Sequence, residues 1–197
     1  DMNQPLGNNI GNALEVMEAF AVLKGETDGR LLDLSLELAA EALVLAGKEK
    51  NVSKAKLRLH KLIKTKEAFL KMAQIIRCQG GNPEVLDDPS LLPIAQKRTT
   101  VSAKKNGFVT SVDAKQIGNA AMILGAGRLT KGQEIFQEVG IRLLKRPGDQ
   151  VSKGDTIAII HSRENYGLKD AQTMAESAIE ISETYSKKAP LVIKRYS

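Results

Sequence analysis

The stretch "DMNQPLGNNIGNALEV" at residues 1–16 contains residue types that can surround a cation. Pro5 and Gly7 impose an irregular backbone just before a helical pattern, so the following helix cannot use all of the carbonyl groups that precede it. Backbone carbonyls are hard oxygen ligands, and a nearby carboxylate can complete such a set. Glu15 and Glu18 lie on that helix, where residue type alone favours solvated carboxylates.

A second candidate is the glycine-containing stretch "GNAAMILGAGR" at residues 118–128. Glycines before a cation occur in phosphate-binding loops, but the spacing here matches neither GxGxxG after a strand nor GxxxxGK[ST]. Because these glycines end a helical pattern, they favour a helix cap with Arg128 in the loop. Phosphate binding remains the less favoured interpretation.

The third candidate is "KRPGDQVSKGDTIAII" at residues 145–160. Its two Gly-Asp pairs around a short strand resemble the hammerhead modules that carry biotin or lipoate. Those modules present a lysine at the tip of a tight hairpin, whereas Lys145 and Lys153 flank turns with a structural pattern. The sequence favours a shared architecture without the carrier function.

The remaining reactive side chains form no recognisable set. His60 and His161 have no ligand-spaced carboxylates or cysteines around them, and neither has a serine–acid context. Cys78 is the single cysteine, which excludes an internal disulfide and fits a reducing, cytoplasmic location; we interpret it as structural. We therefore expect neither catalytic nor substrate-binding residues in this chain.

The elements that would position these residues fall into two parts that meet near Pro89–Pro93. Before that point the periodicity predicts a helix over 8–23 that ends at Gly25, and a helix over 30–46 that is apolar on nearly every face and should be deeply buried. Residues 53–78 predict one bent helix or two consecutive helices.

After Ile94 the pattern changes to short strands with two helices. Residues 99–114 predict two strands around a Lys-Asn-Gly turn, with Val109 and Val112 pointing inward. The further predicted elements are an Asp-capped helix over 113–127, strands over 141–145, 149–151 and 156–160, a helix over 168–184 and a last strand over 190–197. The expected fold class is therefore α+β / α/β, with a helical portion of a truncated α/β domain before a small α/β module with hammerhead-like strands.

The net charge of +6 raises the alternative of nucleic-acid binding. Nine basic residues lie close together: Lys48, Lys50, Lys54, Lys56, Arg58, Lys61, Lys64, Lys66 and Lys71. Apolar residues interleave with them at helical spacing and no aromatic residue is placed to stack on bases, so a solvated helix face is favoured. No apolar run approaches the ~18 residues of a membrane span. We expect no nucleic-acid and no membrane partner.

The opening stretch resembles the pyrimidine-nucleoside phosphorylases, a family that includes thymidine phosphorylase. The family pattern is "DMxQPLGxxxGNALEV", and "LELAAEALVLAGK", "QIGNAAMILGAGR" and "VGIRLLKRPGDQVSKGDTIAIIHS" match family segments in the same order. The matching residues of the opening stretch are Asp1, Gln4, Pro5, Leu6, Gly7, Gly11, Asn12, Ala13, Leu14, Glu15 and Val16. The similarity covers essentially the whole chain.

The resemblance implies reversible phosphorolysis of uridine, thymidine or deoxyuridine, with phosphate and a pyrimidine nucleoside as substrates. Family members are roughly twice this length and carry their phosphate- and base-binding residues upstream of "DMNQPLG". The chain is thus expected to be the C-terminal part of a pentosyltransferase, inactive without the upstream half of the same protein. Residues 1–92 would be the last portion of the central α/β domain, and residues 93–197 the C-terminal module. The parent enzyme is expected to be a homodimer.

The resemblance also implies a monovalent cation site, apparently for potassium. By the family pattern its ligands in this chain would be the backbone oxygens of Leu6 and Asn9 and the carboxylate of Glu18, while Glu15 stays structural. The other ligands would come from the upstream loop. The competing hypothesis is a stand-alone binding module that uses the Lys-rich helix, for which half a cation site would have no use.

Overall fold

The structure is a computed structural model that describes residues 1–185 and 189–196. The chain forms two compact units: residues 1–16 with 92–197, and residues 17–91. Helix α1 (Asn12–Lys24) begins in the first unit and ends in the second. The predicted division into family domains, 1–92 and 93–197, stays a prediction.

The first unit is built on two antiparallel sheets. The four-stranded sheet has the order β1 (Asn9–Gly11), β4 (Gly140–Leu143), β6 (Thr156–Ser162), β2 (Lys97–Ser102). The three-stranded sheet has the order β5 (Gln150–Val151), β3 (Gly107–Val112), β7 (Ile179–Ser182). All neighbouring strands are antiparallel, so the expected mixed α+β module is confirmed.

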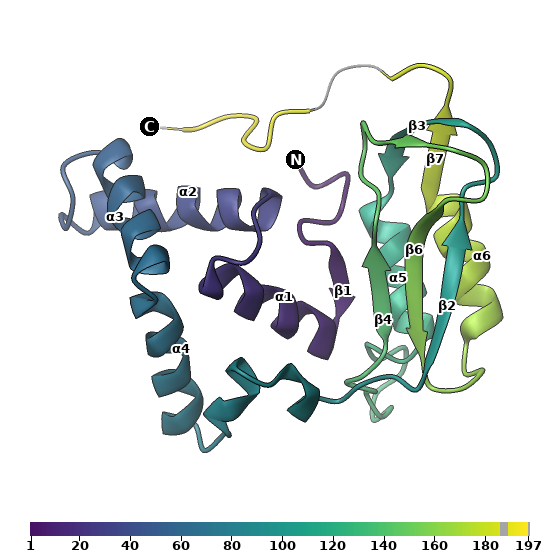
Figure 1. Cartoon of the computed structure of the whole chain (residues 1–197), viewed down its shortest axis with the longest axis horizontal. Helices are drawn as coiled ribbons and strands as arrows, with labels where there is room; N and C mark the ends of the chain where they lie inside the picture. Colours follow the sequence, from purple (N-terminus) through teal and green to yellow (C-terminus); the bar gives the residue numbers. More distant parts are fainter. Residues whose placement is uncertain (186–188, 197) are drawn as a thin grey trace. The chain divides into compact units, whose positions relative to one another are not determined.

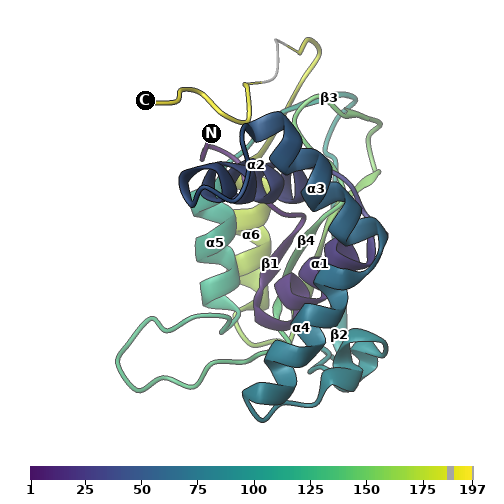
Figure 2. The same cartoon turned by 90° about the vertical axis from the view of Figure 1, so that its left-hand side faces the viewer.

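Two helices, α5 (Ala114–Ile123) and α6 (Leu168–Ala178), run side by side and pack on the four-stranded sheet (Figures 1 and 2). Their alanines permit close packing, and Ala120, Ala171 and Ala175 are fully buried. The sheet supplies alternate residues to this core, because side chains of a strand point to opposite faces in turn. The residues of this sheet that alternate into the core are Val101, Ile141, Leu143, Ala158 and Ile160, and Ile157 of β6 also belongs to the buried cluster.

The second unit is helical. It contains the end of α1, then α2 (Arg30–Leu45), α3 (Val52–Lys64), α4 (Glu67–Cys78) and the short 3-10 helices η1 (Pro83–Leu86) and η2 (Pro89–Leu91). Lys66 adopts a left-handed backbone conformation between α3 and α4, so the segment predicted as one bent helix or two is two helices. Most of the nine clustered basic residues are exposed, which confirms the predicted solvated face. Lys56 pairs with Glu37, and Arg58 pairs with Glu49 at 3.1 Å.

The two strands predicted around the Lys-Asn-Gly turn are confirmed as β2 and β3. They do not pair with each other, because after β2 the chain bonds to the 154–155 turn: the Ala103 N–H donates to the Asp155 carbonyl at 2.8 Å. Two other predictions in the strand-rich part are wrong. The helix predicted over 168–184 ends at Ala178, and Ile179 and Ile181 alternate as strand residues against β3. Residues 190–196 form no strand, since they have no pairing partner within the described part of the chain. The last residue of that predicted strand, Ser197, lies outside the described residues.

Helix α2 is less buried than predicted. Its buried residues are Leu32, Leu36, Glu37 and Ala40, whereas Leu38 is 62% exposed and Leu45 is 88% exposed. Within its unit α2 packs against α3, and Leu32 and Leu36 form a small core with Val22 of α1, so its buried residues lie along one side of the helix. The predictions for Val109 and Val112 are confirmed, since both are buried. None of the helices in the described ranges has the length and apolarity needed to span a bilayer.

Candidate functional site

The opening segment is fixed to the strand-rich part of the first unit through its backbone. The Asn3 carbonyl accepts from the Ala114 N–H at 3.0 Å, the Asn8 carbonyl accepts from the Leu143 N–H at 2.7 Å, and the Ala13 N–H donates to the Gln137 carbonyl at 3.0 Å. These bonds lie before, within and after the loop formed by residues 4–8. The loop predicted to hold a cation is therefore anchored at both ends.

Strand β1 was predicted as the start of a helix, and it forms because glycine allows two backbones to meet closely. Gly11 has φ +142°, and a β-carbon there would lie 2.5 Å from the Val139 carbonyl oxygen. Its partner across the ladder is Gly140. Two glycines at this position let β1 add to the edge of the sheet before α1 begins.

The centre of the loop is the guanidinium of Arg146. Its Nη1 donates to the Pro5 carbonyl at 2.6 Å, and its Nη2 donates to the carbonyls of Leu6, at 3.3 Å, and Gly7. Its Nε donates to the Asn8 side-chain oxygen at 2.8 Å. All three guanidinium nitrogens thus bind one short loop, using the planar fork of donors that distinguishes arginine. We call residues 5–9 the carbonyl loop.

Arg146 is itself held in a tight turn. The Arg146 N–H donates to the Asp149 carboxylate at 2.8 Å, and the Asp149 N–H donates back to the Arg146 carbonyl at 2.9 Å. Gly148, with φ +99°, donates its N–H to the Val109 carbonyl at 2.8 Å. The Pro-Gly-Asp pattern was interpreted only as a structural turn. The arginine directly before this pattern was the sequence signal that the turn could also contact another segment.

Two of the three predicted cation ligands lie in this loop. The Leu6 carbonyl accepts from Arg146, and a carbonyl oxygen has a second lone pair for another partner. Because Asn8 and Leu143 form a hydrogen-bonded pair, the next pair, Asn9 and Arg142, is of the other kind, and the Asn9 carbonyl is directed away from β4. Carbonyl oxygens are a type of ligand atom that suits a monovalent cation.

The two carboxylates of α1 differ in their surroundings. The Glu15 carboxylate accepts from the Gly11 N–H at 3.0 Å, which supports the structural interpretation of Glu15. Glu18 is half-buried and belongs to the second unit. Of the three predicted cation ligands, Leu6 and Asn9 are therefore the two that the first unit brings together. Among the described residues, no group of three or more His, Cys, Asp or Glu is placed to hold a metal. A cation site in this part of the chain would therefore depend on carbonyl oxygens.

The glycine-containing stretch after α5 is a helix end, as predicted. Gly125 has φ +97° and donates its N–H to the Met122 carbonyl at 2.9 Å, so it closes the last turn. Arg128 donates from Nε to the Gln133 carbonyl at 3.1 Å within the loop that follows. The contacts of this loop are thus those of a local structural loop.

His161 lies on β6 with arginines near it on both neighbouring strands. Arg98 is directly opposite on β2, and Arg142 lies on β4 two residues beyond the partner of His161. Burial lowers the pKa of His161, and the positive charges of Arg98 and Arg142 lower it further. His161 is 8% exposed and is therefore neutral at neutral pH.

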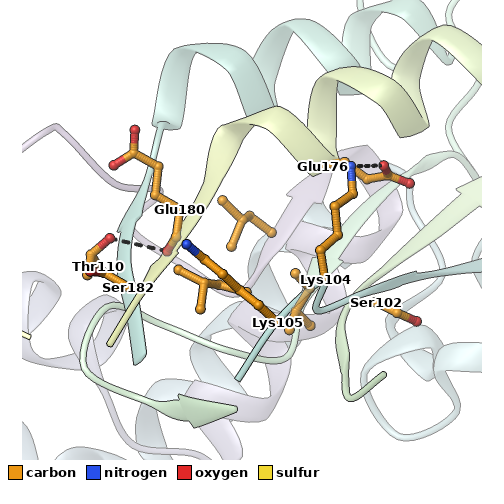
Figure 3. A pocket seen from close by; sticks show the side chains of 10 residues that line it. Ser102, Lys104, Lys105, Thr110, Glu176, Glu180 and Ser182 are labelled. Atoms are coloured by element: carbon orange, nitrogen blue, oxygen red, sulfur yellow. Dashed lines mark hydrogen bonds and ion pairs between the residues drawn. The ribbon is translucent and has the colours of Figure 1, made fainter. Parts of the chain in front are cut away.

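A groove of about 420 Å³ lies between the 102–105 segment, α6 and β7 (Figure 3). Lys104 reaches Glu176 at 2.8 Å, and this bond lowers the pKa of the Glu176 carboxyl. The Thr110 hydroxyl donates to the Glu180 carbonyl at 3.3 Å, and the Glu180 carboxylate accepts from the Ser111 hydroxyl at 2.9 Å. These polar contacts join β7 to β3 and α6 to the segment that follows β2.

Comparison with known proteins shows which family the first unit resembles. Residues 108–182, from β3 to the end of β7, match the profile described as the pyrimidine nucleoside phosphorylase C-terminal domain. Over 183 residues the chain is 42% identical to the pyrimidine-nucleoside phosphorylases of Staphylococcus aureus strains USA300 and NCTC 8325 / PS 47. The chain is thus similar to the C-terminal part of pyrimidine-nucleoside phosphorylases.

The match covers 93% of the chain but 42% of each of these relatives, so the chain spans less than half of their length. A third relative with the same coverage is the pyrimidine-nucleoside phosphorylase of the bovine S. aureus strain RF122 / ET3-1. Arg146 lies inside the matched C-terminal domain, whereas the carbonyl loop it binds lies outside. The domain and the opening segment are thus joined by Arg146 and by β1.

Proposed function

We propose that this chain is the C-terminal part of a pyrimidine-nucleoside phosphorylase and supports catalysis by residues upstream of Asp1. The reaction would be the reversible phosphorolysis of uridine, thymidine or deoxyuridine. An oxygen of inorganic phosphate bonds to C1′ as the bond from C1′ to the base nitrogen breaks. The electron pair of that bond leaves with the base, and the products are the free base, after protonation, and (deoxy)ribose 1-phosphate.

The observation that carries the proposal is the 42% identity over 93% of the chain to proteins of that name. The structure adds a physical reason for the role of this part. Strands β1 and β4, the Gly11–Gly140 approach and Arg146 make a rigid support for the opening segment. Catalysis of this kind depends on holding two substrates in line and on stabilising charge on the departing base, which requires such a support.

We further propose that the carbonyl oxygens of Leu6 and Asn9, with the Glu18 carboxylate, contribute to a potassium site. Bound potassium would supply positive charge beside the phosphate-binding loop. The support from this chain is the kind of oxygen present and the directions of the two carbonyls described above. Dimerisation of the parent enzyme, through its upstream helical domain, is part of the same proposal.

The test is an assay of the full-length protein that contains this chain. Purified protein is incubated with uridine, thymidine or deoxyuridine, with and without inorganic phosphate, in potassium chloride or in choline chloride. We expect release of the free base and of the sugar 1-phosphate only when phosphate is present, and faster release in potassium. Base release that does not depend on phosphate, or no release from any of the three nucleosides, contradicts the proposed function.

A further inference from the structure

We propose that Arg146 is the positioning residue of the carbonyl loop: its guanidinium binds the Pro5 and Gly7 carbonyls closely and the Leu6 carbonyl at a longer distance, so that the Leu6 oxygen can also serve as a cation ligand. This inference rests on the cation site of the proposed function. It assigns a role to a residue of the C-terminal domain that lies some 140 residues from the loop it controls, 141 from Pro5 and 139 from Gly7.

The loop needs such a partner because its own sequence gives it no regular structure. Residues 3–8 belong to no helix or strand, and Pro5 has no N–H to donate. Their carbonyl oxygens therefore need donors from elsewhere, and carbonyl dipoles that point toward one another repel without a positive charge between them. The guanidinium supplies both the donors and the charge, and hydrogen bonds from a charged donor are roughly twice as strong as neutral ones.

The distances divide the carbonyls between two roles. Pro5 accepts from Nη1 at 2.6 Å and Gly7 accepts from Nη2 in a close contact, whereas Nη2 lies 3.3 Å from the Leu6 oxygen. The Leu6 contact is the weakest of the three, so this oxygen is the one best able to bind a second positive group. Holding the Pro5 and Gly7 carbonyls fixes the peptide planes before and after the Leu6–Gly7 peptide, and this restricts the direction of the Leu6 carbonyl.

Lysine could not replace this arginine. The fork reaches two carbonyls from Nη1 and Nη2 while Nε binds the Asn8 side chain at 2.8 Å, and one ammonium nitrogen cannot occupy these positions together. The fork is also oriented in advance, because Asp149 accepts the Arg146 N–H and returns a bond to its carbonyl. Residues that orient metal ligands in this way typically contribute about 10–100-fold to metal affinity.

The experiment compares Arg146→Ala, Arg146→Lys and the neighbouring control Lys145→Ala in the full-length protein. The Lys145 side chain contacts the Gln150 carbonyl at 3.5 Å, on the neighbouring strand β5. Potassium binding is measured as the rise in melting temperature on titration with potassium chloride against choline chloride. Hydrogen exchange of the amides at residues 6–11 is followed in choline chloride.

We expect Arg146→Ala to raise the half-saturating potassium concentration by about tenfold or more and to speed exchange in the carbonyl loop, with β6 unchanged. Arg146→Lys should show the same potassium defect while keeping the native circular dichroism, which makes it the decisive variant if Arg146→Ala does not fold. Lys145→Ala should match the wild type in both measurements.

Unchanged potassium affinity and loop exchange in Arg146→Lys would overturn the inference. So would tighter potassium binding in either Arg146 variant, because it would mean that the guanidinium occupies the place of the cation. A wild-type protein without a potassium response contradicts the cation site and this inference with it. Phosphate-dependent base release from the same protein separates that outcome from failure of the proposed function.

Discussion

Arg146 and Pro5 lie 141 residues apart in the chain, yet the Arg146 guanidinium donates to the Pro5 carbonyl oxygen at 2.6 Å. The bond joins the opening segment to the turn between β4 and β5 of the C-terminal domain. It does so beside β1, whose residues pair with β4. The opening segment is consequently part of the same compact unit as residues 92–197, although the helices of the other unit follow it directly in the sequence.

The close approach of Gly11 to Val139 should make Gly11→Ala strongly destabilising. A β-carbon at Gly11 would lie 2.5 Å from the Val139 carbonyl oxygen, and its φ of +142° disfavours any L side chain. We expect a loss of about 1–3 kcal/mol in the free energy of unfolding from the backbone strain, with further loss from the clash. Urea titration followed by circular dichroism measures it.

Gly118→Ala is the matched control for that substitution. Gly118 lies within α5, and apart from its chain neighbours and the backbone of its own helix no atom lies within 4 Å of the position its β-carbon would take. Alanine there should raise the free energy of unfolding by up to about 1 kcal/mol, because it favours the helical backbone. If both substitutions had the same effect, the account of the β1–β4 approach would be wrong.

His161 should make the fold less stable in mild acid. Burial and the charges of Arg98 and Arg142 lower its pKa in the folded state, whereas the unfolded histidine titrates near about 6.5. As the pH falls through that value the unfolded chain binds the proton first. The contribution of neutral His161 is therefore complete above the unfolded pKa and is lost as the pH falls toward the folded pKa.

The measurement is the free energy of unfolding at several pH values between about 5 and 7.5. His161→Gln should flatten its dependence on pH in this window, whatever the variant does to stability at neutral pH. His60→Gln, which replaces the other histidine of the sequence at an exposed position on α3, is the matched control. A wild-type slope in His161→Gln would contradict the assignment.

The exposed leucines of α2 should make the isolated chain self-associate. Leu38 and Leu45 lie seven residues apart and so share one helix stripe, and they are 62% and 88% exposed. Burying a leucine contributes about 1.5–3 kcal/mol, so replacing both by lysine should weaken association by about 100-fold or more. Sedimentation velocity over a concentration series measures the change.

Leu36→Lys provides the comparison for the leucine substitutions. Leu36 is buried against Val22 and Leu32, so a lysine there should unfold the helical unit rather than make it more soluble. A wild-type chain that stays monomeric at high micromolar concentration would show that the α2 stripe is not an association surface.

The sequence predicted the elements better than their pairing. Helix ends were correct where glycine follows the helix, as at Gly25 and Gly125, because a left-handed residue closes a helix locally. The failures involve neighbours distant in sequence. Strand β7 was predicted as helix, and only its pairing with β3 makes Ile179 and Ile181 strand residues. The pairing of β2 with β6 rather than β3 likewise depends on the 154–155 turn.

The candidate site shows the same limit. Pro5 and Gly7 indicated an irregular backbone with available carbonyls, which the structure has. That the turn at residues 146–149 would deliver an arginine to those carbonyls could not be predicted, because it depends on the β1–β4 register over more than a hundred residues. A charged residue directly before a Pro-Gly-Asp turn is only a weak signal that its side chain binds a distant loop.

The most direct test of the central claim is to assay the purified 197-residue chain alone for phosphate-dependent release of uracil from uridine. The intact mass of every polypeptide in the same sample is measured alongside, so that a co-purifying upstream half is detected. We predict no phosphorolysis when the 21.4 kDa species is the only one found, and activity when the upstream half is present. Robust phosphorolysis by the 21.4 kDa species alone would contradict the claim that the catalytic residues lie outside this chain.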